Sequence, residues 1–369
     1  MTGIRGAMKI GLLAAAWLLV PVSGTFAHRP GVRGTHALYV ANEGSNSVSV
    51  IDVESMKVTA TIPVGAGPQH VAISPDRRSV FVACGRSKEV WILALPAHTV
   101  AAVVPDATGL GGQTVFGYGG TYAYVTNSMD SRVTVIEVDT GKKVALIPVG
   151  ELPTEINISP DGGHAYVPSE RSNTVAVLNL SLNVVASELP AGVRPYAVAV
   201  STDGKYLLVS GAGSNTITVI DVGTHKVLRR IPVGDDPHHV VFGPGGGFAY
   251  VLNRASNNVS ILQMANRQVM ATIPVGKEPS DGDITPSGSY IYVTNMGSND
   301  VSIISTRTSA VVGTIPVGSH PHDIVISGDG RYAFVANTGS DDISVINLLS
   351  QEGVGRISVG KRPGGIALR

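Results

Sequence analysis

The stretch that decides the fold begins with Tyr292-Val-Thr-Asn295 and ends with Ile315-Pro-Val-Gly318. Four short apolar runs lie in it or just before it, at 283–285, 290–294, 301–304 and 311–316. Runs of this length, bounded by Ser, Asn, Asp and Gly, are typical of β-strands joined by tight turns. The stretch therefore predicts four successive antiparallel strands in one unit.

The same unit recurs along the chain. Ile-Pro-Val-Gly or a close variant ends at Gly65, Gly150, Gly192, Gly234, Gly276, Gly318 and Gly360, and from Gly150 onward the spacing is 42 residues. Counterparts of Tyr-Val-Thr-Asn begin at Tyr39, Phe81, Tyr124, Tyr166, Leu208, Tyr250, Tyr292 and Phe334. Eight repeats of four strands indicate an all-β fold, an eight-bladed β-propeller of four-stranded antiparallel blades.

The first repeat lacks its innermost strand, because too few residues lie between Tyr39 and the N-terminal apolar segment. The last segment of the chain, 363–369, matches 321–327 in register and stops where the next turn would begin. We therefore expect it to be the inner strand of a blade whose other three strands are N-terminal, which closes the ring without a covalent bond. A seven-bladed ring with one displaced repeat is the alternative.

These motifs resemble the YVTN-type β-propeller repeat family, common among exported and surface-layer proteins of bacteria and archaea. The resemblance covers about residues 38–369 and implies the propeller fold. It does not imply one function, because propellers serve as enzymes, binding modules and scaffolds alike.

Two polar elements of the repeat are expected to be structural. The motif asparagines should bond the backbone of the loop that follows them, as Asx turns do: Asn42, Asn127, Asn253, Asn295 and Asn337. The Ser-Asn pairs further along this loop, such as Ser298-Asn299, are expected to act in the same way.

Residues 1–27 have the features of a signal peptide. Arg5 and Lys9 precede an apolar run from Ile10 to Val20, and Thr25-Phe26-Ala27 resembles a cleavage site. We expect one mature domain, 28–369, that is periplasmic or extracellular and has no transmembrane segment after cleavage. An uncleaved anchor is the alternative.

Charge and cysteine content restrict the partners. The chain has 27 basic and 27 acidic residues, a formal charge of zero, so a nucleic acid is not expected as a partner. The single cysteine, Cys84, allows no internal disulfide.

Polar residues gather where the loops enter the predicted inner strands. The position two residues after the loop proline, here called the channel ring, reads His70, Gln113, Glu155, Ala197, His239, Asp281, Asp323 and Gly365. The preceding position, here called the mouth ring, reads Gln69, Gly112, Thr154, Tyr196, His238, Ser280, His322 and Gly364. Imidazole and carboxylate groups bind divalent ions and act as acids and bases. The candidate ligand or metal site is therefore His70, Glu155, His238, His239, Asp281, His322 and Asp323.

Three functions remain open from the sequence. The first is an exported binding or scaffold protein that recognises a protein, a glycan or a small ligand on its loop-rich face. The second is a metal-dependent enzyme, a lyase or lactonase, that uses a divalent ion at the channel mouth. The third is a haem-binding propeller akin to the cofactor domain of cytochrome nitrite reductases, suggested by blade number and export alone.

Overall fold

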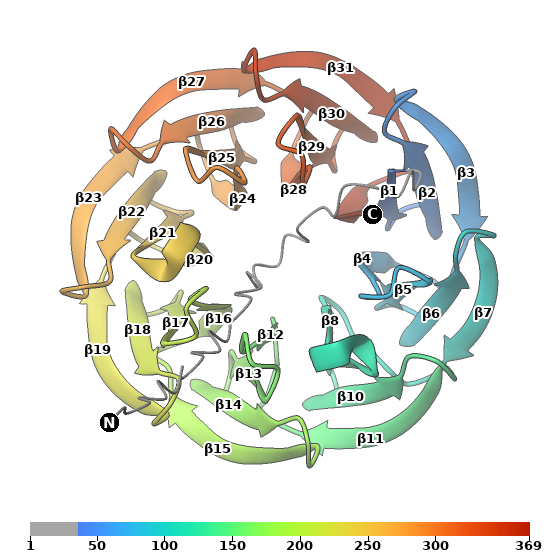
Figure 1. The fold of residues 1–369 in the computed structure, drawn as a ribbon, viewed down its shortest axis with the longest axis horizontal. Coiled ribbons are helices and arrows are strands. Elements are labelled where there is room, and N and C mark those ends of the chain that lie inside the picture. Colours follow the sequence, from blue (N-terminus) through green and yellow to red (C-terminus); the bar gives the residue numbers. More distant parts are fainter. Residues whose placement is uncertain (1–35) are drawn as a thin grey trace, which may run out of the picture.

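The computed structural model describes residues 36–369, so the predicted signal peptide lies outside the described residues. Eight sheets of four antiparallel strands are arranged in a closed ring (Figure 1). The predicted eight-bladed propeller is confirmed, and the seven-bladed alternative is wrong. Within 36–369 no helix has the length and apolar character needed to cross a membrane.

Blades are numbered from 1 to 8 in chain order, and the strands of each blade are called A to D from the axis outward. The A strands are β32 (Pro363–Leu368), β4 (Pro68–Ile73), β8 (Thr114–Phe116), β12 (Asn157–Ile158), β16 (Pro195–Val200), β20 (Pro237–Phe242), β24 (Pro279–Ile284) and β28 (Pro321–Ile326). The B strands are β1 (Ala37–Asn42), β5 (Ser79–Cys84), β9 (Tyr122–Asn127), β13 (His164–Ser169), β17 (Tyr206–Gly211), β21 (Phe248–Asn253), β25 (Tyr290–Asn295) and β29 (Tyr332–Asn337).

The C strands are β2 (Ser47–Asp52), β6 (Glu89–Ala94), β10 (Arg132–Glu137), β14 (Thr174–Asn179), β18 (Thr216–Asp221), β22 (Asn258–Gln263), β26 (Asp300–Ser305) and β30 (Asp342–Asn347). The D strands are β3 (Lys57–Pro63), β7 (Thr99–Val104), β11 (Lys142–Pro148), β15 (Val184–Pro190), β19 (Lys226–Pro232), β23 (Gln268–Pro274), β27 (Ala310–Pro316) and β31 (Glu352–Ser358). Two single 3-10 turns, η1 (Tyr118–Gly120) and η2 (Pro244–Gly246), connect A to B strands.

The C-terminal strand closes the ring as predicted. β32 pairs antiparallel with β1, and Ile366 lies opposite Val40. The chain end is held by the bond from the Arg369 N–H to the Ala37 carbonyl, at 2.9 Å. Blade 1 therefore combines strands from both ends of the described chain.

The core lies between blades. Leu252 on β21 and Val293 on β25, for example, share one apolar cluster, and both are fully buried. Because both faces of the B and C strands meet a neighbouring blade, these strands read as nearly continuous apolar runs. The D strands form the outer wall and are largely exposed.

Six of the eight A strands begin at the loop proline, earlier than the apolar pattern predicts. In blade 7 the strand starts at Pro279, not at Asp283, and a register shift lies between Pro279 and Asp281. A bulge leaves the inserted residue, Ser280, without a ladder partner and redirects the side chains next to it. The polar start of the strand was missed because its side chains face the axis and the next blade instead of an apolar core.

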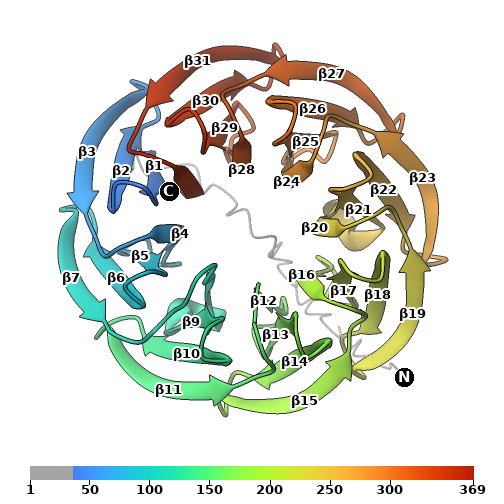
Figure 2. The same ribbon diagram turned by 180° about the vertical axis from the view of Figure 1, so that it is seen from behind.

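The D–A and B–C connections lie on one face, here called the loop face, which Figure 2 views. The Ser-Asn pairs hold this face together. Ser298 Oγ accepts the Lys277 N–H from the loop entering blade 7, at 2.9 Å, and Asn299 Oδ1 accepts the His320 N–H from the loop leaving it, at 2.8 Å. These pairs have a structural role as expected, but Ser298 and Asn299 bond the backbone of the D–A loops and not that of their own loop.

The motif asparagines mostly bond across the blade, not along their loop. Asn295 Nδ2 donates to Asp300 Oδ1 at 2.7 Å and to Ser302 Oγ at 2.9 Å, and Asn42, Asn253 and Asn337 bond C-strand side chains in the same way. Asn127 alone among the five shows the expected bond, from the Asp130 N–H. The expectation was wrong elsewhere because the C strand presents polar side chains five and seven residues after the asparagine.

Candidate functional site

Side chains of the channel ring form hydrogen bonds that join neighbouring blades, and these bonds are here called straps. In five of its eight positions the side chain accepts a hydrogen bond from a backbone N–H of the next blade, which lies on the A strand or, for Ile156, just before it. The bonds are Thr114 N–H to His70 Nδ1 at 3.3 Å, Ile156 to Gln113 Oε1 at 2.8 Å, Val198 to Glu155 Oε2 at 3.1 Å, Ile324 to Asp281 Oδ2 at 3.0 Å and Ile366 to Asp323 Oδ2 at 2.9 Å. The last of these ties blade 8 to the closing strand.

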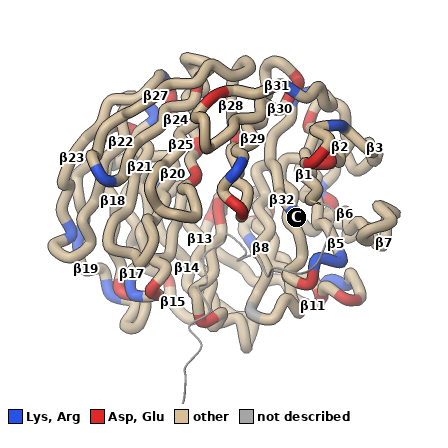
Figure 3. The backbone as a smooth tube through the Cα atoms, turned by 45° about the horizontal axis from the view of Figure 1, so that its top comes forward, with Lys and Arg blue, Asp and Glu red and all other residues tan. Residues whose placement is uncertain are grey.

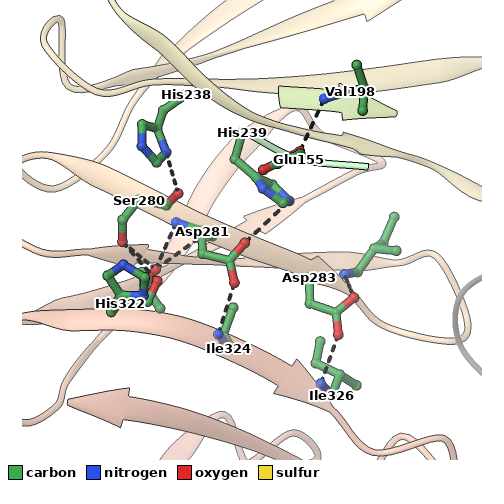
Figure 4. A network of polar contacts seen from close by, with 12 residues as sticks. Glu155, Val198, His238, His239, Ser280, Asp281, Asp283, His322, Ile324 and Ile326 are labelled. Atoms are coloured by element: carbon green, nitrogen blue, oxygen red, sulfur yellow. Dashed lines mark hydrogen bonds and ion pairs between the residues drawn. The ribbon is translucent and has the colours of Figure 1, made fainter. Parts of the chain in front are cut away.

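The ring is most highly charged at blades 6, 7 and 8. His239 Nε2 lies 3.3 Å from Asp281 Oδ1, while the other oxygen of Asp281 accepts the Ile324 N–H (Figure 4). Asp323 of the same ring interacts electrostatically with Asp281. Burial, followed by the charge of Asp281, raises the pKa of Asp323 well above its ordinary value.

Asp283 belongs to the same group and was missed from the sequence. It lies two residues beyond Asp281 on β24 and accepts the N–H groups of Ile284 and Ile326, each at 2.8 Å (Figure 4). Burial raises its pKa to about 6. The alternation of side chains along a strand was the available signal, since residues i and i+2 face the same side.

Two other ring members show opposite effects of burial. Burial raises the pKa of the Glu155 carboxyl to about 7, although the nearby His239 acts against this shift. Burial lowers the pKa of the His70 imidazole to about 4. In both cases the surrounding protein disfavours the charged form.

The mouth ring carries a second set of contacts. His238 stacks on Tyr196 of the preceding blade, with ring centroids 4.3 Å apart, and its Nδ1 lies 3.3 Å from the Ser280 carbonyl, which makes that nitrogen the donor (Figure 4). Burial lowers the pKa of His238 to about 4. Thr154 Oγ1 likewise donates to the carbonyl of Tyr196, at 2.6 Å.

The structure brings some predicted site residues together and separates others. Glu155, His239, Asp281 and Asp323 interact with one another, while His70 lies on blade 2 with no charged neighbour among the causes of its pKa shift. His322 is exposed on the loop face. Across residues 36–369, no group of three His, Cys, Asp or Glu side chains is arranged to hold a metal ion.

The donor atoms explain why this ring is a poor fit for a metal. Both oxygens of Asp281 have partners, Asp323 accepts the Ile366 N–H, and Glu155 accepts the Val198 N–H. An ion at the ring would have to replace bonds that join blades. The arrangement is chemically suited to holding the ring closed.

A groove on the loop face has room for a ligand. It has a volume of about 760 Å³ and spans the loops of blades 7, 8 and 1. This groove, here called the seam groove, is lined by Gly44, Met296, His320, His322, Thr338, Gly339, Asp341, Lys361 and Arg362. Its size is that of a small-molecule pocket.

Most charges in the seam groove are already engaged. Arg362 pairs with Glu43 at 3.2 Å, and Asp341 Oδ1 accepts the Arg362 N–H at 2.8 Å. Within the described residues Lys361 has no ion pair. Elsewhere, acidic and basic residues are interspersed in the view of Figure 3.

Solved structures share the fold. Dihydro-haem d1 dehydrogenase NirN has a TM-score of 0.76 at 18% identity, over 94% of this chain and 77% of that one. Periplasmic gluconolactonase PpgL of Pseudomonas aeruginosa has a TM-score of 0.63 at 20% identity, over 91% and 99%. Apo AztD from Citrobacter koseri has 0.66 at 15%, over 91% and 98%. No curated protein matches the sequence.

The sequence also matches one family model. Residues 113–272 and 224–358, which together make up more than half of the chain, match the model described as lactonase, seven-bladed β-propeller. The eight blades of this chain exceed the number in that description. The chain belongs to the seven-bladed β-propeller lactonase family, as a member with one more blade.

Proposed function

We propose that this protein is an exported binding propeller that holds a small acidic ligand in the seam groove. The observation that carries the proposal is a contrast within the molecule. The polar groups of the channel ring are used to join blades, whereas the seam groove is of ligand size and contains Lys361, an ammonium group without an ion pair among the described residues. A groove lined by an ammonium group and by the imidazoles of His320 and His322 favours a carboxylate or phosphate group.

Isothermal titration calorimetry with citrate and inorganic phosphate tests the proposal, with glycerol as an uncharged control. We expect Lys361→Ala to weaken binding by at least about tenfold, as loss of one charge-assisted bond predicts. Lys277→Ala is the matched control, because Lys277 occupies the same register in blade 7 and its N–H is bound by Ser298 as the Lys361 N–H is bound by Ser45. Equal binding by Lys361→Ala and the unchanged protein would overturn the assignment.

We also propose that residues 1–27 direct export, that the mature chain starts at His28, and that the protein is periplasmic or extracellular and of the YVTN repeat type. The likeness to a periplasmic gluconolactonase and the motif spacing support this proposal. Cell fractionation followed by mass measurement of the N-terminal peptide tests it. A full-length protein retained in the membrane would contradict it.

Lactone hydrolysis is the second candidate, favoured by the family match. Hydrolysis of D-glucono-1,5-lactone by purified protein, with and without added Zn²⁺ or Mn²⁺, tests the metal-dependent version. Activity that depends on the metal and is lost in His239→Ala with Asp281→Ala would support it over the binding proposal. The visible spectrum of the same sample tests the haem alternative.

A further inference from the structure

The B-strand tyrosine of the repeat makes an interblade contact on the face opposite the loop face. Its hydroxyl meets the turn between the C and D strands of the next blade. Tyr39 Oη lies 3.1 Å from His98 Nε2, and Tyr124 Oη donates to Asn183 Oδ1 at 3.1 Å. His98 and Asn183 occupy the same left-handed turn position, with φ of 56° and 54°.

The junction between blades 4 and 5 departs from this pattern. Tyr166 and His225 occupy the corresponding positions, and His225 has φ of 53°. Their rings lie near each other, with centroids 6.4 Å apart, but the Tyr166 hydroxyl and His225 Nε2 are both buried without a hydrogen-bond partner. Tyr166 is fully buried. The equivalent Tyr292 hydroxyl of blade 7 also lacks a partner, so the distinguishing feature of the junction between blades 4 and 5 is the orphaned imidazole nitrogen beside the hydroxyl. Two such atoms at one junction point to a missing ligand.

A second imidazole completes this cluster. His164 begins β13, where four other blades carry tyrosine, and its ring centroid lies 5.1 Å from that of His225. Two imidazoles on one ion, with metal–nitrogen distances of about 2.0–2.1 Å and tetrahedral angles, have centroids roughly 5 Å apart. The carboxylates of Asp161 and Asp221 interact with His164 and His225 respectively.

We propose that His164 and His225 bind a divalent transition-metal ion such as Zn²⁺ at the junction of blades 4 and 5. Imidazole nitrogen is a preferred ligand of this class of ion. Since the described part of the chain contains no ready group of three such side chains, the two nitrogens hold the ion and water completes its coordination. The ion satisfies His225 Nε2, and the Tyr166 hydroxyl donates to an oxygen in the remaining coordination sphere.

Zinc titration of tag-free, chelator-treated mature protein tests this site, with ZnSO₄ as the probe and calorimetry as the readout. We expect one equivalent to bind, and we expect His164→Ala and His225→Ala each to weaken that binding at least about tenfold. His98→Ala is the matched control, because His98 has the same turn position but a satisfied Nε2. His239→Ala with Asp281→Ala separates this site from the channel ring.

Circular dichroism and thermal melting show whether each variant is folded. A zinc-edge anomalous difference map from soaked crystals then locates the ion independently of affinity. A peak between His164 and His225 supports the proposal. A peak elsewhere only, no peak, or equal weakening by His98→Ala overturns it.

Discussion

The buried carboxyl of Glu155 makes the stability of the folded protein depend on pH. Burial raises its pKa from 4.5 to about 7, so between these pH values the folded protein holds the proton more tightly than the unfolded chain does. Its contribution to stability is therefore lost as the pH rises through this window. Gln113, which accepts the Ile156 N–H from the same ring position, shows that an amide can serve as the strap.

Glu155→Gln is therefore expected to stabilise the protein in alkaline solution. The free energy of unfolding of the variant should exceed that of the unchanged protein by about 1–3 kcal/mol at pH 8, and the difference should vanish near pH 4.5. Urea unfolding at a series of pH values measures both quantities. A difference that stays constant with pH would show that the carboxyl does not titrate in this way.

Gly365 shows why one position of the channel ring has no side chain. A Cβ atom there would lie 2.7 Å from the Gln69 carbonyl oxygen and 2.9 Å from His70 Cα, whereas at Gly364 the nearest atom is 3.4 Å away. The closing strand approaches blade 2 backbone to backbone. Gly365→Ala should lower the free energy of unfolding by about 2–3 kcal/mol, because backbone must move.

Gly364→Ala serves as the control for that substitution and should change stability by less than about 0.5 kcal/mol. Thermal and urea unfolding of both variants at one pH measure the difference. Equal effects of the two alanines would mean that the close contact at Gly365 does not constrain the closure.

At the scale of the elements, six of the eight B–C loops are bonded to the D–A loop that leads to the next blade, through the side chain at their positive-φ position. Asn299 has φ of 60° and binds the His320 N–H, so it provides both a left-handed backbone and an acceptor. Blade 8 uses Asp341 at this position, with the same bond to the Arg362 N–H at 2.8 Å. An acidic side chain is therefore compatible with this bond.

Asn299→Ala should cost about 1–2 kcal/mol, and Asn299→Asp less than about 0.5 kcal/mol. Asn299→Gly separates the two roles, because glycine keeps the backbone conformation and removes only the acceptor. Urea unfolding of the three variants gives the comparison. If Ala and Asp were equally costly, the bond to His320 would not be the stabilising feature.

The sequence was informative about elements because the repeat has a fixed period. A constant spacing of 42 residues places equivalent positions on equivalent strands, so the channel ring could be identified by counting. The straps could not be identified in this way. They depend on the bulge after the loop proline and on which backbone N–H lies next to each ring side chain. The seam groove and the His164–His225 pair depend on individual side chains at single junctions, where the period carries no information.

At the scale of the whole molecule, ring closure depends on a seven-residue segment. β32 bonds β1 along one edge, its Ile366 N–H is held by Asp323, and Ile366 packs in the cluster shared by blades 8 and 1. Removing 363–369 opens the ring at blade 1 and exposes the inner edge of β1. The apolar cluster loses one wall at the same time.

Deletion of residues 363–369 is therefore expected to lower the melting temperature by roughly 5–10 °C and to promote self-association through the free edge. Calorimetry and sedimentation measure these two effects. A synthetic peptide of residues 361–369 added in trans should restore much of the melting temperature, because it supplies both the ladder and the donor to Asp323. The same peptide with Ile366→Pro should fail, since proline lacks the N–H. Rescue by both peptides would mean that the segment acts through apolar burial alone and that the strap from Asp323 does not hold the closing strand.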